Sequence, residues 1–148
     1  MEKLLSDELI IQIRQVFEKL SQPVQVLLFV SKDKQEACEP TQQLLGELIP
    51  LSDKLALSVH DLQAEPELAR QYSVLDKAPA IVMAARDGDQ ITDYGIRYLG
   101  VPSGHEFSTL IQDLILVASR DSGLSPQLRN YIKALSKPLH LEVFVTPT

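Results

Sequence analysis

Apolar positions recur along this chain with two periods, and these periods predict the order of its elements. Helical spacing over residues 7–20, with Ser6 as a candidate N-cap and acidic residues in the first turn, predicts an amphipathic helix. Pro23 closes that helix. The apolar run Val24–Val30 is too short for a surface helix, so it predicts a central strand buried on both faces.

The middle of the chain predicts a regular succession of helices and strands. A second helix is expected to begin close to Glu36, with Pro40 in its first turn, where a missing N–H costs nothing. Alternation over residues 55–59 predicts a second strand. Pro66 opens a short third helix, and the apolar segment 79–85 predicts a third strand.

A hairpin and a further helix complete this succession. The pair Asp87-Gly88 suits a tight turn, and the returning strand is expected over residues 93–100. A capping box at Ser103 predicts a helix that starts at Gly104 or His105. The order α-β-α-β-α-β-β-α predicts parallel strands joined by helices, followed by an antiparallel hairpin.

The end of the chain repeats its beginning. Residues 134–148 align with residues 19–33 at a constant offset of 115, and the pattern Leu-Ser-x-Pro followed by Phe-Val recurs in register. Pro126 opens a helix that corresponds to the first one, and the stretch 141–145 predicts a strand that needs a sheet to join. Two interpretations stay open: a second copy of one unit, cut off at its first strand, or a coincidence of two helix-proline-strand segments.

Composition narrows the class of protein. The 148 residues suit one average domain, and the net charge of −6 argues against nucleic acid, whose partners concentrate lysine and arginine. No secretory signal and no apolar run of the roughly 20 residues that a membrane helix needs is found, so we expect a cytoplasmic protein without a membrane partner. Cys38 is the only cysteine, which excludes an intrachain disulfide and a thiolate-rich zinc site, and no metal or cofactor is expected.

Several sequence blocks carry a resemblance to a known family. They are LSDKL (51–55), KAPA (77–80), GIRYLGVPSGHEF (95–107) and the closing FVTPT. With these blocks the chain resembles the protein disulfide oxidoreductases, glutaredoxin-like proteins of two tandem thioredoxin-type units. It is also similar to the N-terminal domain of the flavoprotein component of alkyl hydroperoxide reductase.

The resemblance implies a fold and a domain division. It implies a thioredoxin-like three-layer α/β/α fold with a mixed four-stranded central sheet and an extra N-terminal helix. Residues 1–120 would form this unit, with a degenerate Cys-x-x-Cys motif. Residues 121–148 would be a linker followed by the helix and first strand of a truncated second unit, in which that family carries its next Cys-x-x-Cys.

The candidate redox site lies where the second helix begins. In active members of the family two cysteines occupy this helix tip, because its N–H groups stabilise a thiolate and a second sulfur resolves the mixed disulfide. The matching residues here are Gln35 to Cys38, so Gln35 replaces the first cysteine and Cys38 keeps only the resolving position. We expect a redox-silent unit. Cys38 is interpreted as a buried structural thiol, ahead of a slow regulatory or glutathionylated thiol and of a catalyst.

Ala78 and Pro79 are the second candidate site. Pro79 matches the family's cis-proline, which implies either a retained peptide-binding groove or a turn that merely launches the strand. His105 is interpreted as a helix-start residue, since no nucleophile stands near it in the sequence.

Two functions are compatible with these residues. In the first, the chain is the silent N-terminal unit of a thiol:disulfide oxidoreductase, inactive by itself, and serves as a scaffold or docking surface. Its partners would be protein thiol or disulfide clients, or the missing second unit. In the alternative, it is a stand-alone interaction module that dimerises or binds partners by strand pairing through residues 141–145.

Overall fold

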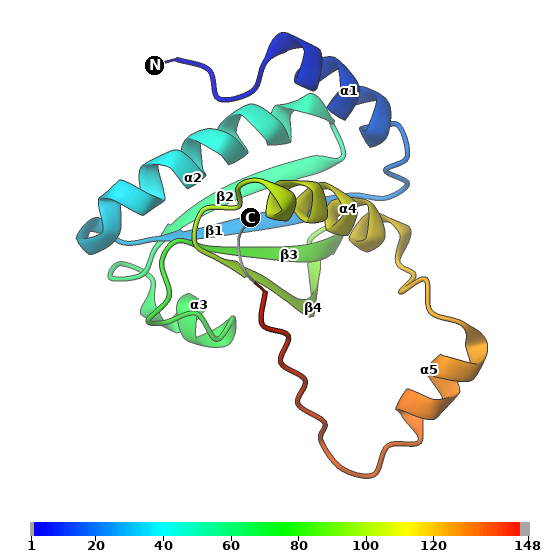
Figure 1. Ribbon diagram of the computed structural model, residues 1–148. Helices are drawn as coiled ribbons and strands as arrows, with labels where there is room; N and C mark the ends of the chain where they lie inside the picture. Colours follow the sequence, from blue (N-terminus) through cyan, green and yellow to red (C-terminus); the bar gives the residue numbers. More distant parts are fainter. Residues whose placement is uncertain (1, 146–148) are drawn as a thin grey trace.

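A four-stranded sheet between helices organises the computed structural model, which describes residues 2–145 (Figure 1). Its order is β2-β1-β3-β4. The pair β1 and β2 is parallel, whereas β3 is antiparallel to both of its neighbours, β1 and β4. The predicted mixed sheet is therefore confirmed. The strands are β1 (Val24–Val30), β2 (Leu55–Asp61), β3 (Ala80–Asp87) and β4 (Gln90–Leu99).

Helices follow in the predicted order and cover both faces of the sheet (Figure 1). The N-cap predicted for the first helix is present, because the Ser6 hydroxyl accepts a hydrogen bond from the Leu9 N–H at 3.2 Å. The α-helices are α1 (Asp7–Phe17), α2 (Gln35–Leu48), α3 (Pro66–Gln71), α4 (His105–Ser119) and α5 (Pro126–Lys133), with short 3-10 turns at Lys32–Lys34 and Ile49–Leu51.

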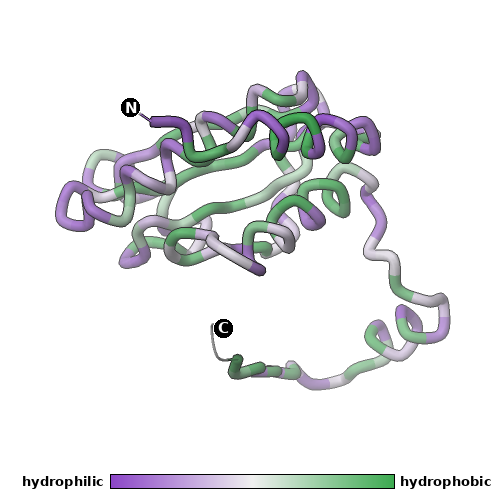
Figure 2. The backbone as a smooth tube through the Cα atoms, turned by 45° about the horizontal axis from the view of Figure 1, so that its top comes forward, coloured by the Kyte–Doolittle hydropathy of each residue, from purple (hydrophilic) through white to green (hydrophobic). Residues whose placement is uncertain are grey.

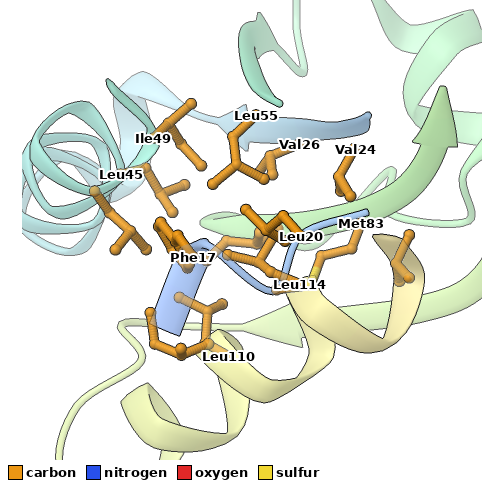
Figure 3. Close-up of a cluster of buried hydrophobic side chains, with 14 of the residues drawn as sticks. Phe17, Leu20, Val24, Val26, Leu45, Ile49, Leu55, Met83, Leu110 and Leu114 are labelled. Carbon is orange, nitrogen blue, oxygen red and sulfur yellow. The ribbon is translucent and has the colours of Figure 1, made fainter. Parts of the chain in front are cut away.

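Strand β1 is buried on both faces because it separates two hydrophobic cores. Val24, Val26 and Leu28 face the core formed with α1, α2 and α4, part of which Figure 3 shows. Leu27 and Phe29 face the smaller core under α3. This arrangement is the expected three-layer α/β/α architecture, and it explains why the β1 sequence is almost continuously apolar.

Two predictions about how helices begin are wrong. Pro40 does not lie in the first turn of α2 but inside the helix. The helix tolerates it because Glu36, whose carbonyl loses its partner, is exposed to water. The N-cap of α4 is Gly104, with φ +59° and no side-chain hydrogen bond, so the predicted capping box at Ser103 is not formed.

The C-terminal arm, which we define as residues 126–145, leaves the rest of the molecule (Figure 2). Helix α5 forms as predicted, with the Ser125 hydroxyl accepting from the Leu128 N–H at 3.2 Å. The strand expected over 141–145 does not form: within the described range this stretch has no paired neighbour, and Leu141 is 79% and Phe144 89% exposed. A strand needs a hydrogen-bonding neighbour, and the arm lies away from the sheet. Residues 146–148 of the predicted repeat lie outside the described residues.

Arg120 closes the body of the fold. It ends α4 in the left-handed conformation with φ +56°. Its guanidinium donates to the carbonyl oxygens of Val117 and Pro23, both at 2.8 Å, and of Arg86 at 3.2 Å. One side chain thereby joins the end of α4, the start of β1 and the end of β3.

Candidate functional site

The start of α2 carries the candidate redox residues at one end of the sheet. After β1 the Ser31 hydroxyl accepts a hydrogen bond from the Asp33 N–H at 3.3 Å, which shapes a 3-10 turn that runs into α2. Gln35 is the first residue of α2 and is exposed, whereas Cys38 is only 5% exposed. The two positions of the motif therefore differ in access to solvent.

This arrangement offers little for thiol chemistry. The Gln35 amide is not a nucleophile, and it donates a hydrogen bond to the Glu39 carboxylate one turn further along. Cys38 is the only cysteine of the chain and is free and buried, so a client disulfide has no direct route to its sulfur. Disulfide exchange also needs a second thiol to release the mixed disulfide.

Pro79 lies at the same end of the sheet as the start of α2. Phe29, near the end of β1, pairs with Ala80, the first residue of β3, so the preceding Pro79 lies close to the β1–α2 connection. The Ala78–Pro79 peptide bond is cis. Pro79 itself is buried, and its carbonyl accepts a hydrogen bond from the Gly100 N–H at 2.9 Å. The sheet register thus brings the two candidate sites to one end.

Gly100 links this site to the connection between β4 and α4. Its φ of +101° is one that side chains rarely allow, which explains a glycine at this point of the GIRYLGVPSGHEF block. Beyond it, residues Val101 to Gly104 border a shallow apolar groove of about 340 Å³. The opposite wall of the groove comes from α2, with Pro40 and Leu44, from Leu4 in the segment before α1, and from Leu9 of α1.

Sequence reasoning missed the N-terminal wall of this groove. The Glu47 carboxylate of α2 accepts hydrogen bonds from the backbone N–H groups of Leu4 at 3.0 Å and Leu5 at 2.9 Å. These bonds, that of Leu5 first, hold the pKa of Glu47 below its ordinary value. The adjacent apolar pair Leu4-Leu5 before the N-cap was the available signal, but nothing in the sequence indicates its partner on α2.

Two polar residues of the GIRYLGVPSGHEF block are held by structural contacts. The Arg97 Nε donates to the Tyr72 carbonyl at 2.9 Å, and its guanidinium pairs with Asp93 at 2.6 Å. The Tyr98 hydroxyl donates to Asp113 at 2.6 Å, and burial, followed by this bond, raises the pKa of Tyr98. The alternation of residues 97 and 98 across the strand is therefore used for packing on both faces.

His60 belongs to a small polar cluster between β2 and the start of α3, and His105 stands apart from it. The two ring nitrogens of His60 lie 2.9 Å from the Ser58 hydroxyl and 2.9 Å from the Glu65 carboxylate. His105 is the exposed first residue of α4. Over residues 2–145 no group of three or more histidine, cysteine, aspartate or glutamate side chains is placed to hold a metal ion. No helix in that range is long and apolar enough to cross a membrane.

The fold is thioredoxin-like. The chain superposes on the structure of a protein disulfide oxidoreductase from Aeropyrum pernix with a TM-score of 0.74 at 24% identity, covering 88% of this chain and 55% of that one. Trichomonas vaginalis thioredoxin gives a TM-score of 0.50 at 15% identity, with 70% of this chain and 86% of that one covered. These likenesses concern the fold alone.

Relatives in sequence include alkyl hydroperoxide reductases of the AhpF kind. The NTD_N/C domain structure of AhpF from Enterococcus faecalis has a TM-score of 0.76 at 28% identity, covering 90% of this chain and 62% of that one. The corresponding reductase sequences of Staphylococcus aureus and Pseudomonas aeruginosa are each 26% identical over 145 and 133 residues, which is 98% and 90% of this chain. The chain spans about a quarter of their length, 25% and 22%. No family model matches it.

Proposed function

We propose that this chain is a redox-silent thioredoxin-like unit of a thiol:disulfide oxidoreductase, and that it serves as a scaffold or docking surface for a catalytic second unit. The observation that carries the proposal is the start of α2, where Gln35 stands in place of a first thiol and Cys38 is buried. The relatives support the class, since they are redox proteins with thioredoxin-like N-terminal domains. In this role its partners are protein thiol or disulfide clients, or the catalytic second unit.

The proposal includes a division of the chain. Residues 1–120 are the silent unit, and residues 121–148 are a linker with the beginning of a second one. The offset of 115 residues supports this division, as does the position of Arg120 at the close of the body. A cytoplasmic location fits a chain whose only cysteine is free and buried, because disulfides are rare in that compartment.

Insulin reduction by dithiothreitol, followed as turbidity, tests the silence of the unit. We expect no stimulation by the chain, because a single buried sulfur cannot complete the exchange cycle. A thioredoxin serves as the positive control. Clear stimulation that disappears in Cys38→Ser would overturn the proposal.

Restoring the missing sulfur tests whether the site is a degenerate Cys-x-x-Cys. Gln35→Cys places two cysteines at the motif spacing in the first turns of α2, and Gln35→Ser is the matched control. We expect the variant to lose both free thiols on mild oxidation, by thiol titration of the monomeric fraction, because helix starts of this fold accommodate such a bond. If both thiols stay free after oxidation, the start of α2 does not have the geometry of a Cys-x-x-Cys site.

A second function, of a different class, is favoured by the C-terminal arm. Val143 is 84% and Val145 80% exposed, in a stretch whose composition is that of a strand. In this alternative the chain is an interaction module that dimerises or binds partners by strand pairing through residues 141–145.

A further inference from the structure

We infer that residues 139–145, which we call the arm strand, add to the free edge of β2 in a second copy of the chain. The exchange is reciprocal, so that two copies form a symmetric dimer. This inference rests on the second of the two proposed functions. It names the partner and the edge that the strand joins.

The arm exposes enough apolar surface for such a dimer. Tyr131 of α5 is 66% exposed, and in the arm strand Leu139 is 65% and Phe144 89% exposed. With the remaining apolar residues of the arm, the surface is on the order of 1,000 Å² per copy, against the roughly 800 Å² that each partner buries in an interface of standard size. Charge adds to this: the arm has three basic residues, of which Arg129 pairs with Asp121, against the single acidic residue Glu142, on a chain of net charge −6.

Strand β4, one of the two edges of the sheet, is protected against pairing. Its register with β3 shifts between Met83 and Ala84, which leaves Tyr94 and Gly95 as an unpaired bulge. Gly95 has φ +86°, and its N–H donates to the Asp93 carboxylate at 2.9 Å. A bulge of this kind twists an edge away from an incoming strand.

Strand β2, the opposite edge, is regular. Its residues from Leu55 to Asp61 pair with β1 in unbroken parallel register. Val59, the most exposed residue of this strand, is 41% exposed. A regular edge that carries an exposed apolar side chain is the kind of edge to which another strand adds.

The arm strand and the β2 edge have matching faces. Leu57 and Val59 of β2 are in register with Val26 and Leu28 and so lie on the side of the larger core, whereas Ser58 lies on the other side. In the arm strand the odd-numbered residues 139, 141, 143 and 145 are apolar, while His140 and Glu142 are polar. One register therefore places apolar beside apolar and polar beside polar; Phe144 alone departs from the alternation.

Mass measurement of the full chain tests the dimer. Size-exclusion chromatography with light scattering at concentrations up to about 100 µM should give twice the chain mass of 16.5 kDa. A monomer at every concentration would overturn the inference, including a monomer whose arm folds back on its own sheet. The insulin assay is independent of this result, because the silent unit stays silent as monomer or dimer.

Matched variants test which edge is used. Val143→Pro removes an N–H from the arm strand without touching the body, and Val59→Lys places a charge on the β2 edge; each should weaken the dimer at least about tenfold. Ile91→Lys, on β4 and similarly exposed at 37%, is the control and should leave the dimer intact. A dimer that survives Val143→Pro, or that is lost in Ile91→Lys and not in Val59→Lys, would refute the assignment to β2.

A covalent trap gives a second readout that does not depend on stability. Equal amounts of Val59→Cys and Val143→Cys proteins, both in a Cys38→Ser background, should form a mixed disulfide dimer on mild oxidation. The control mixture replaces Val59→Cys by Ile91→Cys. Equal yields from the two mixtures would mean random collision and would contradict the inference.

Discussion

The first helix–strand segment, α1 with β1, and the C-terminal arm have related sequences and opposite surroundings. At the offset of 115 residues Phe29 corresponds to Phe144, and Leu20 to Leu135. Phe29 is fully buried and Leu20 is 3% exposed, whereas Phe144 is 89% and Leu135 40% exposed. The same pattern of apolar residues is a core element in one place and a bare surface in the other.

The difference lies in the neighbours. Strand β1 pairs with β2 on one side and β3 on the other, and helices cover both of its faces. The arm has no such neighbours among the described residues. A sequence with strand propensity therefore forms a strand only where tertiary contacts provide hydrogen-bonding neighbours.

Hydrogen exchange should show the largest contrast between the two segments. The amides of Val26 and Leu28, in the centre of the sheet, should be protected at least about a thousandfold more than those of Leu141 and Val143, because opening β1 requires global unfolding. Mass spectrometry of peptides at low micromolar concentration measures this. Equal protection of both segments in dilute solution would contradict the difference in their surroundings. Protection of the arm that rises with protein concentration would show that the arm binds a second molecule.

Removing a phenylalanine side chain from each segment should give the second-largest difference, measured in the free energy of unfolding. Phe29→Ala should lower the free energy of unfolding by about 3–5 kcal/mol, because it leaves a cavity in the core under α3. Phe144→Ala should change it by no more than about 0.5 kcal/mol in dilute solution, because the ring packs on nothing that folds with the body. Urea unfolding followed by circular dichroism gives both values. Similar losses from both would show that the arm is part of the core.

The smallest difference between body and arm is expected in the free energy of unfolding when one of two Asp–Arg pairs is removed. The hydrogen bond from Arg97, and after it that from the Gly95 N–H, hold the pKa of Asp93 below its ordinary value. The pair therefore stabilises the fold at pH values above the pKa that Asp93 has in the unfolded chain. This stabilisation is lost as the pH falls through the lower pKa of the folded state. Asp93→Asn should cost roughly 1 kcal/mol at pH 7 and flatten the acid side of the stability curve.

The matched variant in the linker is Asp121→Asn. The Gly123 N–H and then Arg129 lower the pKa of Asp121, but this carboxylate is 56% exposed and its partners belong to the arm and linker. Its loss should leave global unfolding unchanged at every pH, by urea titration from pH 3 to pH 7. An equal effect of both variants would contradict the separation of arm and body.

Much of the fold was predictable because it depends on local patterns. The apolar run of β1 predicts a central strand, and the Asp87-Gly88 pair predicts the hairpin that joins β3 and β4. The capping of α4 was not predictable in the same way. Ser103 has the right spacing, but the N-cap is Gly104, whose φ is positive. This conformation depends on the connection between β4 and α4 and not on the residues of the capping box.

The residues of the candidate site came from the resemblance to a known family, whereas part of their surroundings did not follow from the sequence. The resemblance to a known family singled out Gln35, Cys38 and Pro79, and the structure brings them to one end of the sheet because β3 pairs with β1. The interpretation of Cys38 as a buried thiol agrees with its exposure of 5%, whereas the groove wall made by Leu4 depends on contacts between distant segments. Such contacts leave no periodic trace in a single sequence.

Arg120 has a consequence for force applied to the molecule. A force applied to the C-terminal arm is transmitted to the sheet at Arg120, whose guanidinium donates hydrogen bonds to three backbone carbonyls of the body. Cargo fused behind the arm would therefore load the anchor before it loads any strand. Arg120→Ala should let the last turn of α4 peel away at lower force in a single-molecule pulling experiment.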